Sequence, residues 1–389
     1  MANEKSGNLL QETNLHIIFS ITLVAVMGVA SITPAFPTII EEFGIKREKI
    51  AWLITVFTVP GVVLTPVMGV VADRIGRKRV IVPSLFLFAI AGVACGFTTN
   101  YNTLVIFRFF QGIGAASLGS INVTLIGDIY QGQRRGAAMG YNASVLSIGT
   151  AVYPGIGGAL ALLGWNFPFF FPILAVPVGI WVITSLKNPE PEGMEKFFRY
   201  LINALKSMSY KKVIGLFSLS ICTFIILYGA YLTVFPLLLK ESFDASSLEI
   251  GLIMSSMSVA TAITSSGAGK LIDKYPKSRI IMGGFVLYTI SLVLIPLMPG
   301  LIYIVIPAVI FGIAQGLNLP ASLTLLSDLS TMKYRAAFMS VNGMVLRLGQ
   351  TIGPLIMGMV MATFDLSTAF YLSAILSVIM IALAKLMLE

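Results

Sequence analysis

The sequence predicts an all-α membrane protein with twelve transmembrane helices, arranged as two pseudo-symmetric six-helix bundles. Three observations lead to this prediction. The 389-residue chain is 57% hydrophobic and 11% charged, with a mean hydropathy of +0.91, which is typical of integral membrane proteins and excludes an ordinary soluble domain. Twelve apolar runs are each long enough to cross a bilayer. The two halves of the chain also resemble each other in sequence.

The apolar runs predict the spans in order, because about 20 apolar residues form a helix that crosses the hydrocarbon core. The expected span cores are residues 15–37, 50–72, 80–98, 103–126, 137–163, 167–186, 213–239, 248–272, 280–298, 301–327, 336–363 and 367–388. Most connections between them are short. The function is therefore expected to be located within the membrane bundle.

The longest connection, residues 187–212, separates an N-terminal bundle (1–186) from a C-terminal bundle (213–389). It begins with an Asn-Pro-Glu-Pro-Glu-Gly run at 188–193, which ends the sixth helix. Apolar residues then recur at helical spacing opposite basic ones: Phe197, Leu201, Leu205 and Met208. This pattern favours either a helix on the membrane surface or a partly ordered tether between the bundles.

Basic residues fall in alternate connections, which predicts how the chain is oriented. Of the 26 Lys and Arg residues, 20 lie on one side of the predicted membrane, 4 on the other and 2 inside spans. The positive-inside rule then places both termini and the linker in the cytoplasm, with the protein in the plasma or inner membrane. Topology thus accounts for the net charge of +9, and we do not expect a nucleic-acid partner.

An internal repeat at an offset of 200 residues indicates that the two halves share one fold. Gly69 and Asp73 recur as Gly269 and Asp273. Further matching pairs are Asp128 and Asp328, Arg135 and Arg335, Asn142 and Asn342, Gly149 and Gly349, and Pro154 and Pro354. Two six-helix halves in the same orientation predict a pseudo-twofold axis along the membrane normal and a central cavity near the midplane, which is the architecture of a secondary transporter.

The connection between spans 2 and 3 carries a specific motif. It reads Gly69-x-x-x-Asp73-Arg74-x-Gly76-Arg77-Lys78-Arg79. This run resembles the signature loop of the major facilitator superfamily, and the resemblance extends over essentially the whole chain. Gly69 permits close helix contact and Gly76 a tight turn, while Asp73 can face the positive amino-terminal end of span 11. A basic turn that only sets topology would explain the last three residues of the run but not Asp73 or Asp273.

Two more motifs resemble subgroups of that superfamily. In span 4, Arg108-Phe-Phe-Gln111-Gly112 is similar to a motif of proton-driven members, in which a buried Arg influences proton transfer. In span 5, residues 149–158 are similar to the Gly-Pro motif of twelve-span drug:proton antiporters, although Tyr153 replaces the usual Gly before Pro154. Small residues here allow close approach to a helix of the other half, with generic glycine packing as the alternative. Residues implied in gating or coupling are Gly69, Asp73, Arg74, Gly76, Arg77, Arg108, Asp128, Pro154, Gly158 and Asp273.

Polar side chains within the spans are the candidates for substrate binding. Arg108 and Arg347 lie well inside apolar runs, where an unpaired Arg costs about 2.5 to 3.5 kcal/mol, so each requires a partner, water or an anion. The neutral candidates serve equally well as packing residues. The full set is Met27, Arg108, Gln111, Asn142, Tyr228, Tyr231, Gln315, Asn318, Asn342 and Arg347.

Acidic residues are informative because all 17 lie near span ends, in connections or at the termini. Many drug:proton antiporters carry a membrane-embedded acid, and this chain departs from that pattern. The departure favours neutral, zwitterionic or anionic lipophilic substrates over permanent cations. Proton coupling through Asp73, Asp128 or water-linked Arg108 stays open.

The resemblance implies a secondary active transporter that exports small amphipathic molecules by alternating access, coupled to protons in the manner of multidrug efflux. The alternative is a carrier for a specific metabolite, such as an organic anion or sugar. The spans lack an embedded His cluster, a metal-spaced carboxylate pair and a nucleophile motif, so we expect neither an enzyme nor a cofactor or metal site. The expected partners are a small-molecule substrate, protons and the lipid bilayer, and the expected form is a monomer.

Overall fold

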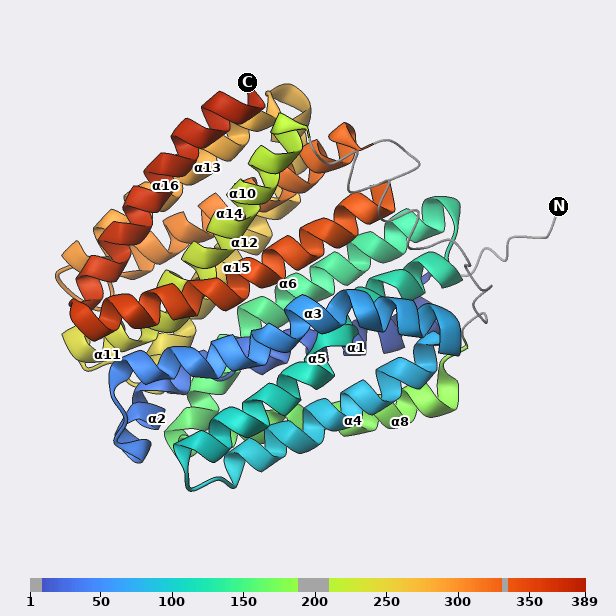
Figure 1. Ribbon diagram of the computed structural model, residues 1–389, viewed down its shortest axis with the longest axis horizontal. Coiled ribbons are helices and arrows are strands. Elements are labelled where there is room, and N and C mark those ends of the chain that lie inside the picture. Colours follow the sequence, from blue (N-terminus) through green and yellow to red (C-terminus); the bar gives the residue numbers. More distant parts are fainter. Residues whose placement is uncertain (1–8, 188–209, 331–334) are drawn as a thin grey trace.

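The computed structural model describes residues 9–187, 210–330 and 335–389, and every regular element in these ranges is helical (Figure 1). Twelve helical segments are long and apolar enough to cross a membrane, which confirms the predicted fold. The predicted amphipathic stretch at 197–208 lies outside the described residues.

The N-terminal half contains six spans. They are α1 (Thr13–Ala30) with η2 (Thr33–Ala35) and α2 (Phe36–Phe43); η3 (Arg47–Ile50) with α3 (Ala51–Ile75); α4 (Arg77–Gly96); α5 (Tyr101–Ile129); α6 (Gly132–Leu163); and α7 (Phe167–Phe170) with η4 (Phe171–Leu174) and α8 (Ala175–Ser185). A short turn, η1 (Leu9–Gln11), precedes the first span.

The C-terminal half contains the other six spans. They are α10 (Lys211–Ile225) with the π-helical segment η5 (Ile226–Val234) and α11 (Phe235–Phe243); α12 (Ser247–Lys274); α13 (Lys277–Leu294) with η6 (Ile295–Leu297); α14 (Val305–Leu329); α15 (Arg335–Thr363); and α16 (Leu366–Leu388).

Spans 1 and 7 are longer than their apolar cores predict. Span 1 ends at Phe43 and span 7 at Phe243, because α2 and α11 each begin with a Phe-Pro pair, and Pro is well suited to the first turn of a helix. Each then ends in a left-handed residue, Gly44 with φ of 55° and Asp244 with φ of 50°. These two residues are 200 positions apart, so the repeat extends to backbone conformation.

The two ends of the bundle differ in how tightly the halves meet. We call the end that holds the turns at Gly76 and Tyr275 the basic end, and the end that holds Arg47 and Phe364 the opposite end. At the opposite end, the Arg47 guanidinium donates to the carbonyl of Phe364 at 2.9 Å and to that of Met361 at 3.3 Å, and Nη1 lies 3.4 Å from Oε2 of Glu241. These contacts link span 2 to spans 7 and 11 and close this end.

Glycines along spans 2, 5, 8 and 11 show where the halves separate. A Cβ at Gly158 would lie 2.3 Å from the Ser247 carbonyl oxygen, and one at Gly251 would lie 2.3 Å from that of Pro154, so spans 5 and 8 touch backbone to backbone toward the opposite end. Toward the basic end, a Cβ would meet nothing within 4 Å at Gly69, Gly136, Gly140, Gly267, Gly269 or Gly343. The halves therefore diverge toward the basic end, as the two groups of helices do in Figure 1.

Candidate transport site

Arg108 lies inside the N-terminal half and is fully buried. Its Nε donates to the Leu53 carbonyl at 3.1 Å, and Nη1 donates to the Gly28 carbonyl at 2.9 Å and to Oε1 of Gln111 at 2.6 Å. The guanidinium carbon lies 4.2 Å from the centre of the Phe57 ring. Spans 1, 2 and 4 thus hold the charge with neutral acceptors and a cation–π contact, and only Nη2 has no hydrogen-bond partner.

Arg347 in α15 is placed quite differently, because it reaches from the C-terminal half to helices of the N-terminal half. A Cβ at Gly61 in α3 would lie 3.3 Å from its Cδ, and one at Gly119 in α5 would lie 3.9 Å from its Nη2. The residue is partly exposed, and its side chain makes no hydrogen bond or ion pair to any residue in the described ranges. The segment η5, which carries Tyr228, packs against α15 and places Tyr228 near Arg347. Arg347 therefore occupies the interface of the two halves with its donors unused.

Two residues that sequence reasoning missed lie beside Arg347 along α15. The Thr351 hydroxyl bonds to the Thr58 hydroxyl at 2.9 Å, which is a polar contact across the two halves in midspan. Oε1 of Gln350 is buried and has no hydrogen-bond donor. Residues three and four apart are neighbours on the surface of a helix. Positions 350 and 351 stand in this relation to Arg347, and this spacing is the sequence signal that could have identified them.

The neutral candidates divide between the two half-bundles. In the N-terminal half, Oδ1 of Asn142 accepts from the Thr22 hydroxyl at 2.6 Å. In the C-terminal half, Oε1 of Gln315 accepts from Tyr288, and Oδ1 of Asn318 accepts from Ser322 at 3.2 Å. These bonds lie within one half each and account for Asn142 and Gln315 in this conformation, whereas Nδ2 of Asn318 is buried without a hydrogen-bond partner in the described ranges. Asn342 and Met27 are buried as well.

The two tyrosines of the π-helical segment face different surroundings. Tyr231 is fully buried and stacks between Phe235 and Phe311, with ring centres 4.7 Å apart in both cases. Tyr228 is partly exposed and stacks on Phe224 at 6.0 Å. The structure therefore brings Tyr228 and Arg347 together and leaves Tyr231 within the C-terminal core.

The signature loop forms an ion-pair network within its own half. Arg77 pairs with Asp73 one turn earlier, and its Nε lies 3.0 Å from Oδ2 of Asp128 at the end of α5. The repeat contains a simpler version, in which Nζ of Lys277 lies 3.0 Å from Oδ2 of Asp328. The close helix contact expected at Gly69 is not made in this conformation, because a Cβ there would meet nothing within 4 Å. The approach of Asp73 to the start of span 11 stays a prediction, since residues 331–334 lie outside the described ranges.

The span 5 motif forms the inter-half contact that its small residues predict. Gly158 and Pro154 touch α12 through the backbone approaches described above, and the Gly155 amide donates to the Ser255 hydroxyl at 3.1 Å. Tyr153, which replaces the usual Gly, packs edge-on against Phe171 at 5.3 Å within the N-terminal half. The larger side chain therefore points away from the interface and leaves the contact with α12 intact.

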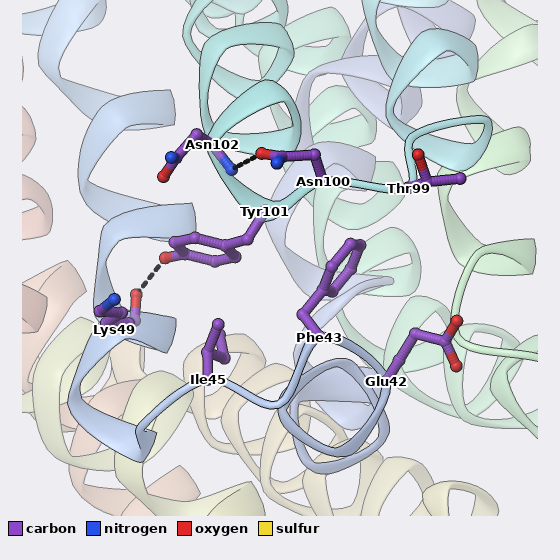
Figure 2. A pocket seen from close by; sticks show the side chains of 8 residues that line it. All are labelled: Glu42, Phe43, Ile45, Lys49, Thr99, Asn100, Tyr101 and Asn102. Carbon is purple, nitrogen blue, oxygen red and sulfur yellow. Dashed lines mark hydrogen bonds between the residues drawn. The ribbon is translucent and has the colours of Figure 1, made fainter.

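A pocket of about 330 Å³ opens at the opposite end, between the ends of spans 1, 2 and 4 (Figure 2). Figure 2 shows that Glu42, Lys49, Asn100 and Tyr101 lie around it, and the Tyr101 hydroxyl donates to the Lys49 carbonyl at 2.5 Å. Asn100 is also the N-cap of α5. The residues predicted to bind substrate do not line this pocket, so we place the candidate transport site at Arg347 instead.

Comparisons with known proteins agree with this architecture. The family model described as Major Facilitator Superfamily matches residues 18–238 and 217–389. The chain belongs to the major facilitator superfamily. It is a multi-pass membrane transporter and not an enzyme.

Relatives of similar length carry names that refer to drug resistance. Multidrug resistance protein 1 of Bacillus subtilis is 27% identical over 380 residues, which covers 95% of each chain. Quinolone resistance protein NorA of Staphylococcus aureus is 24% identical over 358 residues, covering 90% of this chain and 89% of NorA.

Solved structures of other transporters share the fold at low sequence identity. A single-residue mutant of the nucleoside transporter NupG superposes with a TM-score of 0.82 at 15% identity, over 98% of this chain and 100% of that one. The D-xylose-proton symporter gives 0.77 at 15% identity, over 96% of this chain and 97% of that one.

Proposed function

We propose that this transporter exports small amphipathic molecules from the cytoplasm by proton-coupled alternating access. The observation that carries the proposal is the one-sided contact between the halves: they are joined at the opposite end and diverge toward the basic end. Arg347 lies at the interface between them with no partner in the described ranges. A polar site between two halves that separate on one side is what alternating access requires.

The basic end is assigned to the cytoplasm on the strength of its excess of Lys and Arg. Both termini then lie in the cytoplasm, and the conformation described here is inward-facing. Single cysteines at Ser246 and Tyr275, in a chain that lacks Cys95 and Cys222, test this assignment in intact cells. A membrane-impermeant maleimide is expected to label position 246 and to leave position 275 unlabelled, and the reverse pattern would invert the orientation.

Closure of the basic end is the step in which the signature loop acts. In the inward-facing state Asp73 pairs with Arg77, which also pairs with Asp128. When the halves rock together, Asp73 approaches the amino-terminal end of α15, where the helix dipole favours a carboxylate. Arg74, Gly76, Gly69 and Asp273 belong to the same moving surface, while Pro154 and Gly158 hold the contact around which the halves rock.

Purified protein in proteoliposomes with an imposed pH gradient tests the proposed function. We expect gradient-driven movement of amphipathic dyes, and we expect Asp73→Asn to lower the rate at least about tenfold, while the folded yield is retained, because the contact exists in only one state. Asp244→Asn is the matched control, since Asn tolerates the left-handed backbone at that position. Transport by Asp73→Asn at the parental rate would exclude this role for the signature loop.

The names of the relatives support drug export, whereas the unpaired Arg347 also favours the second candidate, a carrier for one anionic metabolite. Competition distinguishes the two. If chemically unrelated amphipaths inhibit transport of one another, the site is broad, and if one compound and its close analogues alone compete, the carrier is specific.

A further inference from the structure

We infer that Arg347 is the recognition point for the anionic group of an amphipathic carboxylate, held between the two halves with its apolar part toward Tyr228 and Phe224. This inference rests on the proposed transport function and names the class of substrate. It starts from the guanidinium of Arg347, a charged donor group that has no hydrogen-bond acceptor within the described ranges.

The first step concerns the energy of an arginine at this depth. A guanidinium carries five N–H donors, and within a membrane such a charge pairs with another group or faces water. Arg347 has no acceptor in the described ranges, is partly exposed and lies on the side where the halves diverge. A ligand that enters from the basic end therefore meets an unpaired positive charge.

The second step concerns the room around that charge. Gly61 and Gly119 present no side chain to Arg347, so the arginine lies directly against α3 and α5. An anion bound to Arg347 consequently contacts both halves at once. Binding at such a junction influences the relative population of the inward-facing and outward-facing states, as a transported substrate must.

A third and independent observation comes from Gln350, one turn further along α15. Its Oε1 is buried without a donor, which is costly unless water, or an N–H or O–H group of the ligand other than its carboxylate, supplies one. Gln350 follows Arg347 by three residues, so the two polar side chains are neighbours on successive turns of α15. Packing alone would favour apolar residues at both positions.

The charge of the site selects a monoanion. Arg108 and Arg347 are the only basic residues well inside the apolar cores, and Arg108 already has three acceptors. One guanidinium balances one negative charge, whereas a dianionic phosphate would retain a net charge in a low-dielectric cavity. The planar fork of Arg also matches a carboxylate in a bidentate arrangement. The stacked rings of Tyr228 and Phe224 provide the apolar surface.

The test uses dansyl-glycine, a fluorescent amphipathic carboxylate, and dansyl-glycinamide, its neutral counterpart of the same size. Binding to the full-length protein in nanodiscs is measured by fluorescence titration. We expect the acid to bind about tenfold or more tightly than the amide, as a charge-assisted bidentate contact implies. We expect Arg347→Ala and Arg347→Gln to abolish that preference and Arg347→Lys to restore part of it.

Arg279→Ala is the matched control, because Arg279 is exposed at the basic end and its replacement removes the same charge elsewhere. It is expected to keep the parental preference for the acid. Equal binding of acid and amide by the parental protein, or a preference for the acid that survives in both Arg347→Ala and Arg347→Gln, would overturn the inference.

Failure of the site and failure of the proposed function give different results. If proteoliposomes export dansyl-glycinamide under a pH gradient and the acid has no advantage, the transport function stands and the Arg347 site is wrong. If the acid binds in an Arg347-dependent manner and no gradient-driven transport of either compound occurs, the site stands and the proposed function is wrong.

Discussion

Arg108 and Arg347 are both set deep in apolar helices, yet they have opposite surroundings. Arg108 is enclosed by spans 1, 2 and 4 and donates to three acceptors. Arg347 crosses from the C-terminal half to glycines of the N-terminal half and has no acceptor in the described ranges. The same side chain therefore serves as an internal structural link in one half and is left available for a ligand at the interface.

The difference predicts that the two arginines contribute unequally to stability, and this is the largest expected effect. Arg108→Ala removes three hydrogen bonds and leaves a cavity, which should lower the free energy of unfolding by about 2 to 5 kcal/mol. Arg347→Ala removes no such bond and should change the free energy of unfolding by less than about 0.5 kcal/mol. SDS titration of the purified protein, followed by circular dichroism, measures both. If both variants lost the same free energy of unfolding, the contrast between a bonded Arg108 and an available Arg347 would be wrong.

A conservative replacement sharpens the same contrast. Lysine retains the charge of Arg108 but lacks the planar fork that reaches the Gly28 and Leu53 carbonyls together. We expect Arg108→Lys to cost about 1 to 2 kcal/mol in the same titration, since it loses one or two bonds from a charged donor. Arg347→Lys should leave the unfolding free energy unchanged, and a loss comparable to that of Arg108→Lys would show a bound acceptor at Arg347.

The surroundings of Arg347 should also change with conformation, whereas those of Arg108 lie within one rigid half. The Thr58–Thr351 hydrogen bond joins the halves beside Arg347. Thr58→Val keeps the shape and removes this bond, so it should shift the balance between inward-facing and outward-facing states by about 0.5 to 1.5 kcal/mol. Distances between spin labels at the basic end report the shift. The control is Thr184→Val, whose hydroxyl bonds only within its own span. An unchanged distance distribution in Thr58→Val would assign the bond no role in conformation.

The smallest effect tests the space around Arg347. A Cβ at Gly61 would lie 3.3 Å from Arg347, which is a tight contact, whereas one at Gly119 would lie at an ordinary 3.9 Å. Gly61→Ala is therefore expected to displace the guanidinium and weaken dansyl-glycine binding about two- to fivefold. Gly119→Ala is the matched control and should bind as the parental protein does. Equal affinities in both variants would mean that Arg347 adjusts freely.

Much of the fold follows from the amino-acid sequence, because lipid imposes simple requirements on it. A helix that crosses a bilayer needs an uninterrupted apolar run, and so the twelve spans follow from hydropathy alone. The repeat at 200 residues likewise predicted the two related halves, and it extends to the left-handed residues at Gly44 and Asp244. The location of Arg108 and Arg347 inside spans was equally visible.

The rotation of each helix about its own axis was not visible in the same way. The spans are apolar on nearly every side, so periodicity does not reveal which face meets a neighbour. Tyr228 and Tyr231 are three residues apart, yet one approaches Arg347 and the other is stacked between Phe235 and Phe311. Gln350 was not among the predicted site residues, because hydropathy does not show which face of span 11 it lies on. Its spacing of three residues from Arg347 was the available signal.

Hydropathy was enough to place two arginines within the membrane, whereas three-dimensional packing decides which of them has hydrogen-bond donors available for a ligand. Two of the acceptors that hold Arg108 are backbone carbonyls, 55 and 80 residues away along the chain. A carbonyl group is present at every residue, so no residue type marks the ones that will face a guanidinium. Only the packing of spans 1, 2 and 4 brings them to Arg108, and only the divergence of the two halves leaves Arg347 without an equivalent set.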